Sequence, residues 1–219
     1  DLDKKSKIYL TELSREALQG LHMDIYSLIN ETLAKVYINT GDLDNAIQSC
    51  EPDIVFHLAA QALVRKSYTE PLNTWSTNVI GSLNVLEAIQ KNIEHPCAVV
   101  MITTDKVYLN KEWCHGYRET DRIGGKDPYS GSKGAAELLI YSYVESFFKK
   151  KESNVRVGIG RAGNVIGGGD WASYRIVPDC VRSWSKNEKS EIRNPLATRP
   201  WQHVLEPLSG YISLIVKLS

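Results

Sequence analysis

Three apolar runs, separated by stretches of helical length, constrain the fold of this chain more than any other feature. The runs cover residues 53–60, 97–104 and 155–160, and the intervals contain helical patterns at 71–92 and 128–149. Nearly unbroken apolar runs are typical of strands buried on both faces of a parallel sheet. Strands that alternate with helices therefore predict an α/β fold with a doubly wound parallel sheet and right-handed crossovers.

Shorter patterns predict further elements around these runs. Residues at helical spacing indicate an amphipathic helix near the start, although Gly20 falls inside it: Leu18, Leu21, Ile25 and Leu28. A short strand is expected at 35–39, and residues 40–42 turn out of it into a small helix. In the helix 71–92 one side is expected to form the core face: Val79, Leu83, Leu86 and either Ile89 or Gln90. Four elements are predicted beyond residue 160: a glycine-rich loop at 167–171, a helix at 176–185, an extended segment at 199–204, and a helix from about Glu206 that is cut off at Ser219.

The composition excludes several classes of protein. The 219 residues carry 26 basic and 26 acidic side chains, so no nucleic-acid surface is indicated. Apolar residues make up 42% of the chain, enough for a sizeable core. No apolar run approaches the roughly 20 residues of a membrane span, no signal peptide is visible, and no metal site is predicted. The cysteines form no C-x-x-C pair, which favours reduced thiols in a cytoplasmic protein: Cys50, Cys97, Cys114 and Cys180.

A helix is predicted to start at Asp127-Pro128-Tyr129. Aspartate is a favoured N-cap and proline a favoured first helical residue, which places Tyr129 in the first turn and Lys133 one turn later on the same face. A neighbouring ammonium and the positive end of a helix both favour a phenolate, so we expect the pKa of Tyr129 to be lowered. Tyr129 then becomes a candidate proton acceptor. The alternative is a solvated Tyr and Lys on a helix surface.

Thr104, Asp105 and Lys106 end the second apolar run. Ligands of open parallel sheets bind beyond the carboxyl ends of the strands, which is where these three side chains are expected to lie. The Tyr129-x-x-x-Lys133 pattern is unspecific on its own, and the position of these three residues strengthens its interpretation as part of a catalytic site. A simple ion pair between Asp105 and Lys106 at the strand end is the alternative interpretation.

Glycine patterns do not supply a phosphate-binding loop. The segment 158–163 matches G-x-G-x-x-G after a predicted strand, but the residues that follow it, Asn164 to Gly169, cannot start the helix whose N-terminus receives a pyrophosphate. Gly124 and Gly125 follow a polar loop and not a strand. We therefore expect a sheet that is incomplete at its N-terminal edge, lacking a first strand and its glycine-rich turn, and a chain that is a fragment of a longer product.

Several segments resemble the extended short-chain dehydrogenase/reductases that act on sugar nucleotides, and among these the 4,6-dehydratases. The resemblance covers about residues 35–219 and is carried by HLAAQALVRKSY, TNVIG at 77–81, TTDKVY, RETDRIGGKDPYSGSK, RAGNVIGGGDWA and RPWQHVLEPLSGY. Lys106 stands where members that act on dTDP-glucose and GDP-mannose carry Glu. The resemblance implies a Rossmann-like NAD-binding domain over 1–160 and the truncated start of a sugar-nucleotide-binding region over 161–219.

The resemblance also implies roles for individual residues. For the NAD cofactor, Asp42 would bond the adenine, Asn78 would support the helix that carries Tyr129, and the segment after the first apolar run would line the site: Leu58, Ala59, Ala60 and Gln61. Thr104 would bond the sugar 4-hydroxyl, Tyr129 would take its proton, and Lys133 would hold the nicotinamide ribose. The sugar nucleotide would contact Asn164 and Arg199, whose fork of donors suits a pyrophosphate, with Arg175 and Arg193 as further candidates.

The reaction implied by the family is an internal redox cycle on a sugar nucleotide. Hydride leaves C4 for NAD, water is lost across C5 and C6, and the hydride returns at C6. Asp105 would protonate the departing 6-hydroxyl, for which burial has to raise its pKa, and Lys106 occupies the position of the C5 base. The family also pairs the helices 71–92 and 128–149 into a homodimer, for which ordinary core packing is the alternative.

Three functional interpretations remain open at this point. A dehydratase is favoured by Asp105 and Lys106, which a sugar-nucleotide epimerase does not need. A non-catalytic remnant that only binds a partner or a nucleotide is favoured by the missing phosphate loop, whereas Thr104, Tyr129 and Lys133 count against it. Histidines add little, because His57 in an apolar strand is more typical of a hydrogen-bonded core residue, and His203 suits a structural or a nucleotide-flanking role equally.

We predict that the 219-residue chain binds NAD weakly. The pyrophosphate is normally held by a glycine-rich turn and a helix N-terminus, and without them Asp42, Ala60, Tyr129 and Lys133 contact opposite ends of the cofactor. Isothermal titration calorimetry with NAD tests this expectation. A dissociation constant on the order of one micromolar, about −8 kcal/mol, would show that another segment, such as 158–163, cradles the phosphates.

Overall fold

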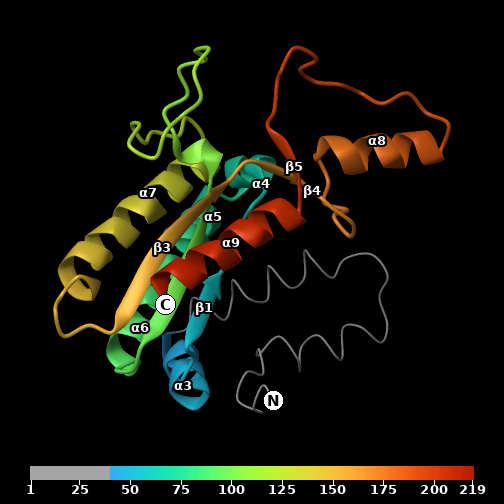
Figure 1. Cartoon of the computed structure of the whole chain (residues 1–219). Helices are drawn as coiled ribbons and strands as arrows, with labels where there is room; N and C mark the ends of the chain where they lie inside the picture. The colour runs from blue at the N-terminus through green and yellow to red at the C-terminus, as the bar shows by residue number, and fades with distance from the viewer. Residues whose placement is uncertain (1–39) are drawn as a thin grey trace.

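A three-stranded parallel sheet forms the centre of the molecule. The computed structural model describes residues 40–219, and Figure 1 shows β1 (Ile54–His57), β2 (Cys97–Thr104) and β3 (Val155–Ala162) side by side. The strands pair in the order β1-β2-β3, with Met101 of β2 facing His57 and Ile159. The predicted parallel sheet is therefore confirmed. The helix predicted near 18–28 and the strand predicted at 35–39 lie outside the described residues.

Helices cover both faces of this sheet, as a doubly wound fold requires (Figure 1). On one face, α6 (Gly81–Asn92) and α7 (Pro128–Tyr143) pack over side chains from alternate positions of β2, and α3 (Thr40–Cys50) adds Leu43 to the same core. On the other face, Ile215 of α9 (Leu205–Leu218) packs against Ala98 and Val100. β2 lies between both layers, which explains why seven of its eight residues are buried. Residues 40–42, predicted as a turn, form the first turn of α3.

β1 is shorter than predicted and is buried on one face only. His57 is buried and Val55 packs against the core under α6, whereas Ile54, Phe56 and Leu58 are exposed. The exposed side chains of β1 lie on the face where α9 packs against β2 and β3. The expectation that the run 53–60 is buried on both faces is therefore wrong for the described residues. A continuous apolar run does not reveal which strand lies beneath a neighbouring helix.

The long helix predicted at 71–92 is present, with an irregular centre. It consists of α5 (Pro71–Trp75), a π-helical segment η1 (Ser76–Ile80) and α6. Leu86 and Ile89 are buried as predicted, but Gln90 is exposed and Val79 and Leu83 are only half-buried. The extra residue in a π turn rotates the helix face, so a strict α-helical spacing misplaces the buried side.

α7 begins and ends almost where the sequence indicates. Asp127 is its N-cap and accepts a hydrogen bond of 3.0 Å from the Ser130 amide, while Pro128 occupies the first position. A π-helical segment η3 (Val144–Phe148) continues the helix to the residue before Lys149. A short helix α4 (Val64–Thr69), which the sequence patterns did not predict, lies between β1 and α5.

The chain beyond β3 contains a second, two-stranded parallel sheet. β4 (Asn164–Ile166) pairs with β5 (Trp201–His203), and the predicted helix appears between them as α8 (Ile176–Ser185). β4 follows the G-x-G-x-x-G segment directly, so no helix N-terminus stands there. The glycines serve packing instead, because a Cβ on Gly160 would lie 2.8 Å from the ring of Tyr211 in α9. The division of the chain at residue 160 stays a prediction, and β3 runs through it to Ala162.

We predict that Leu86→Ala lowers the free energy of unfolding by about 2–5 kcal/mol, because Leu86 is fully buried between α6 and the sheet. Gln90→Ala, on the same helix α6 but exposed, is the matched control and is expected to change it by about 0.5 kcal/mol or less. Urea unfolding followed by circular dichroism measures both. Equal losses in the two variants would contradict this packing.

Candidate active site

The polar end of β2 places three predicted site residues in one hydrogen-bonded group. Thr104 is the last residue of β2, and a 3₁₀ turn η2 (Asp105–Val107) follows it at once. Thr104 Oγ1 donates to Asp105 Oδ1 over 3.0 Å and accepts from the Lys106 amide over 3.4 Å. Lys106 Nζ donates to Asp105 Oδ1 over 3.0 Å. The side chains of Asp105 and Lys106 remain about one-third exposed, at 32% and 33%.

Tyr129 joins this group from the first turn of α7. A hydrogen bond links the side chains of Tyr129 and Thr104, and both residues are buried. The pKa of Tyr129 lies above its ordinary value of 10.0, first because burial disfavours the phenolate, an effect that the hydrogen bond with Thr104 only partly offsets. The sequence predicted the opposite direction. The prediction was wrong because it counted the charge of Lys133 and left out the loss of solvent.

Lys133 lies one turn further along α7 with its ammonium inside the protein. Nζ donates to the carbonyl oxygen of Ile102 over 3.2 Å, so it approaches the backbone near the end of β2. Burial lowers its pKa from 10.5 to about 8, and the charge of Glu137 acts in the other direction. The two N–H donors that remain on an ammonium suit the hydroxyl groups of a ribose.

Asn78 connects the segment after β1 to α7. Its amide nitrogen donates to Ser132 Oγ over 2.9 Å and to the Gln61 carbonyl over 3.2 Å, and its oxygen accepts from the Gln61 amide over 2.8 Å. The Gln61 side chain is engaged with Thr74 and Leu63. Asn78 therefore holds the helix that carries Tyr129 against the loop predicted to line a cofactor.

The remaining cofactor candidates follow β1. Ala59 and Ala60 are buried, whereas Leu58 is 52% exposed. The side-chain contacts predicted for Asp42 lie outside the described part of the chain. His57 is buried with Nε2 3.1 Å from Ser82 Oγ, and burial, together with the charge of Lys133, lowers its pKa to about 3. A neutral, hydrogen-bonded core histidine fits these contacts.

The predicted substrate contacts are only partly brought together. Asn164, in β4, accepts from Lys106 Nζ over 3.3 Å and so belongs to the group at the end of β2. Arg175 pairs with Asp170 over 2.7 Å, and its charge acts on Tyr129. Arg193 donates to the Tyr174 carbonyl over 3.0 Å, and Arg199 donates to the neighbouring Thr198 carbonyl over 2.6 Å. These contacts do not connect Arg193 or Arg199 to Thr104 or Tyr129.

Sequence reasoning missed a buried ion pair beside these residues. Glu137 of α7 is 2% exposed and forms a two-pronged pair with Arg161 near the end of β3. Glu137 also accepts from Thr103 Oγ1 over 2.5 Å. The sequence did contain a pattern that could have indicated this residue, because Glu137 stands four residues after Lys133 in an otherwise apolar stretch of the predicted helix. The spacing places the two charged side chains on one helix face.

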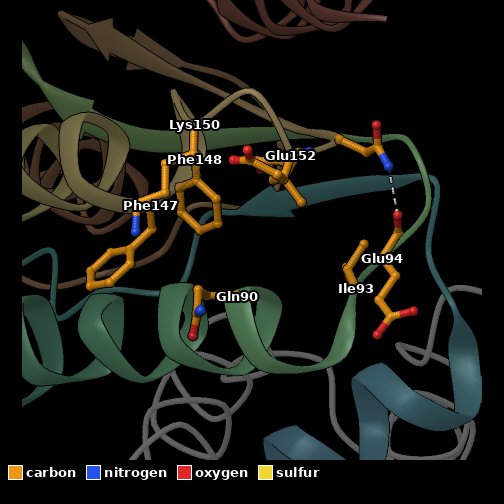
Figure 2. Close-up of a pocket in the computed structure, with 10 residues that line it drawn as sticks. Gln90, Ile93, Glu94, Phe147, Phe148, Lys150 and Glu152 are labelled. Carbon is orange, nitrogen blue, oxygen red and sulfur yellow. Dashed lines mark hydrogen bonds between the residues drawn. The ribbon is translucent and has the colours of Figure 1, made fainter.

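A cavity of about 410 Å³ lies elsewhere, and Figure 2 shows that residues from the end of α6, from η3 and from the segment that follows η3 line it. The lining includes Ile93, Phe148 and Val155, at the end of the sheet where β2 and β3 begin. Tyr129 and Thr104 lie at the other end of β2, so this cavity is separate from the candidate site. Within residues 40–219 no three metal-ligating side chains gather, and no helix there is long and apolar enough to cross a membrane.

A family model described as GDP-mannose 4,6 dehydratase matches residues 12–217 of the chain. The chain belongs to this family. Within it, the chain is 52% identical over 179 residues to a CDP-glucose 4,6-dehydratase of Salmonella typhimurium, which covers 80% of the chain and 50% of that relative. This agrees with Lys106 and with the GNVIGGGDWA and RPWQHV segments, which resemble the CDP-glucose enzyme more than its dTDP-glucose and GDP-mannose relatives.

Solved structures share the fold of the family. A UDP-N-acetylglucosamine 4-epimerase of Methanobrevibacter ruminantium M1 is 26% identical with a TM-score of 0.66, over 79% of this chain and 54% of its own. A dTDP-glucose 4,6-dehydratase of Streptomyces venezuelae is 20% identical with a TM-score of 0.69, over 84% of this chain and 53% of its own. The chain thus spans about half the length of the relatives it matches. The Rossmann-like fold is confirmed.

We predict that Lys133 changes how stability depends on pH. Between its folded pKa of about 8 and its ordinary value of 10.5, the unfolded chain binds more protons than the folded one, so stability gains with rising pH. The free energy of unfolding of the wild-type chain, compared with that of Lys133→Met, is therefore expected to rise by about 2 kcal/mol from pH 7 to pH 10. Urea unfolding at both pH values measures the difference. Lys126→Met, which changes an exposed lysine, should show the same pH dependence as the wild type. If the difference in free energy of unfolding between the wild type and Lys133→Met were the same at both pH values, it would contradict the burial of the Lys133 charge.

Proposed function

We propose that this chain is part of an enzyme that converts CDP-glucose to CDP-4-keto-6-deoxyglucose, a lyase of deoxysugar synthesis that works in the cytoplasm. The single observation that carries the proposal is the continuous set of contacts from Tyr129 through Thr104 and Asp105 to Lys106. This set combines a proton acceptor for a hydroxyl with a second acid and base. The likeness to CDP-glucose 4,6-dehydratase, at 52% identity, supports the choice of nucleotide.

A bound NAD would supply the redox chemistry of the proposed reaction, the removal of hydride from C4 of the sugar and its return at C6. Lys133 fits the nicotinamide ribose because its buried ammonium already uses one donor on Ile102 and has two more. Thr104 holds the 4-hydroxyl of the sugar, and Tyr129 takes its proton as the phenolate. Because burial raises the pKa of Tyr129, the fraction of phenolate grows with rising pH. The ketone at C4 then makes the hydrogen on C5 acidic, and water can be lost across C5 and C6.

Asp105 and Lys106 supply the acid and the base of that elimination. Moving one proton along their 3.0 Å hydrogen bond turns the ion pair into a neutral amine and a carboxylic acid. The amine of Lys106 removes the C5 hydrogen as a proton, and Asp105 gives its proton to the departing 6-hydroxyl. After water leaves, Lys106 is again an ammonium and Asp105 a carboxylate, so the step balances. The contact from Lys106 to Asn164 orients the base.

We also propose that the enzyme is a homodimer through the helices 71–92 and 128–149. α5 and α7 lie close together, since a Cβ on Gly131 would come within 3.4 Å of the Trp75 side chain. Both helices carry large exposed apolar residues, which are favourable to bury against a second copy: Leu72, Trp75, Ile80, Leu138 and Tyr141. Binding of the sugar nucleotide by Asn164 and Arg199, with Arg175 and Arg193, belongs to the same proposal.

A second candidate is another reaction on a sugar nucleotide, such as 4-epimerisation. The likeness to the Methanobrevibacter 4-epimerase favours it. An epimerase has no use for a paired acid and base beside Thr104, so Asp105 and Lys106 separate the two candidates.

We predict that Asp105→Asn and Lys106→Met stop the reaction after oxidation of the sugar. In the protein extended to the full length of its CDP-glucose 4,6-dehydratase relative, rapid mixing with CDP-glucose should show reduced nicotinamide absorbance that appears and persists, because only water loss is blocked. Tyr129→Phe should show no such absorbance and should retain less than roughly a tenth of the turnover. Lys126→Met, in the exposed loop before α7, is the matched control and should behave as wild type. Loss of product in both elimination variants without any reduced nicotinamide would refute the roles of Asp105 and Lys106.

A further inference from the structure

Glu137 is the most completely buried charged side chain near the candidate site. Arg161 Nε lies 2.8 Å and 3.0 Å from its two carboxylate oxygens, and Arg161 Nη2 donates to it as well. Thr103 Oγ1 donates the remaining hydrogen bond. Thr103 and Arg161 are partners in the register of β2 and β3, so the carboxylate of α7 spans the ends of two strands.

On one side, this carboxylate fixes the end of β2 against α7. Two consecutive residues of β2 are held by residues one turn apart on the helix: Ile102 by Lys133, and Thr103 by Glu137. Thr104 follows immediately and contacts Tyr129. The bond from Thr103 to Glu137 therefore sets where Thr104 and Asp105 stand relative to the phenol.

On the other side, Arg161 holds the segment that leaves the site. Its Nη1 donates to Tyr108 Oη over 2.8 Å and to the Glu119 carbonyl over 3.1 Å, and its guanidinium lies 4.8 Å from the centre of the Tyr108 ring. Tyr108 is the residue after η2, which contains Asp105 and Lys106. The Glu137–Arg161 pair thus holds both ends of the segment from Thr103 to Tyr108.

We propose that Glu137 is a positioning residue for the dehydratase reaction, which with Arg161 fixes Asp105 and Lys106 against Tyr129. The inference rests on the proposed function. A buried ion pair is a poor source of net stability compared with apolar residues of similar size. We therefore expect the Glu137–Arg161 pair to have a role other than stabilising the fold. The two-pronged contact with Arg161 and the further hydrogen bond from Thr103 fix the orientation of the Glu137 carboxylate.

Glu137 also acts on the charge of Lys133. Charged and titratable groups around Lys133 come from three elements: Glu137 on α7, His57 on β1, and Arg161 on β3, which is paired with Glu137. His57 is neutral at physiological pH because burial lowers its pKa to about 3. Removing the carboxylate leaves Arg161 unpaired and lowers the pKa of Lys133 further below about 8.

The kinetic test uses the protein extended to the length of its CDP-glucose 4,6-dehydratase relative. Glu137→Gln keeps the shape and removes the charge, whereas Thr103→Val removes only the bond to β2 and keeps the ion pair. Both are expected to lower kcat by about a hundredfold while KM stays within about twofold, because a displacement of about 1 Å costs that much in rate. Only Glu137→Gln should also move the alkaline limb of the kcat profile to lower pH. Glu145→Gln, an exposed glutamate just beyond α7 that pairs with Lys149, is the matched control and should change neither quantity.

Hydrogen exchange of the 219-residue chain gives a readout that needs no activity. Both Glu137→Gln and Thr103→Val should speed exchange at 104–109 by about tenfold or more and leave α6 unchanged. Folded variants that keep kcat within about threefold and exchange at the wild-type rate would overturn the positioning role. If the wild-type enzyme is inactive on CDP-glucose, the proposed function fails, and the exchange rates still decide whether Glu137 fixes this segment.

Discussion

The contact between the carboxyl end of β2 and the first turns of α7 is the constraint on which the candidate site depends. β2 is covered by helices on both faces, so its direction is set by the whole core. At its end the side chains change from apolar to polar, and buried polar groups need partners. α7 provides them in order along one face: Tyr129 for Thr104, Lys133 for the Ile102 carbonyl, and Glu137 for Thr103. The same bonds that satisfy the strand end assemble the site.

Burial also disfavours the charged forms of the two titratable side chains that α7 brings to this site, Tyr129 and Lys133. Loss of solvent raises the pKa of Tyr129 and lowers the pKa of Lys133 to about 8, so both changes disfavour charge. Asp105 and Lys106, whose side chains are about one-third exposed, form an ion pair beside them. The site therefore combines a buried part, Tyr129 and Lys133, with a more exposed part, Asp105 and Lys106. Under the proposed function the buried part would handle the proton of a hydroxyl, and the exposed part would supply an acid and a base 3.0 Å apart. That division matches a reaction with two separate proton transfers.

Sequence reasoning succeeded where the deciding interactions are local. The bounds of β2, the start of α7 at Pro128 and the N-cap by Asp127 all follow from a few adjacent residues. It failed where contacts with a distant part of the chain determine the position or burial of a side chain. Arg161 is 24 residues from Glu137 and directly follows the predicted strand 155–160, and nothing in that strand indicates that the Arg161 side chain turns toward α7. The exposed face of β1 and the π turn in the long helix have the same cause, because both depend on how neighbouring elements pack.

The position of Asn164 links the two parts into which the sequence divides the chain. Lys106 follows β2 in the first part, and Asn164 begins β4 in the second, 58 residues later, yet their side chains meet at 3.3 Å. β4 is held in place by β5, since Asn164 is the register partner of Trp201. The orientation of Lys106 therefore depends on a small sheet built from residues on both sides of α8. Under the proposed function Lys106 is a base whose position is fixed from the second part of the chain, so binding of a nucleotide there would be physically coupled to the chemistry at the sugar.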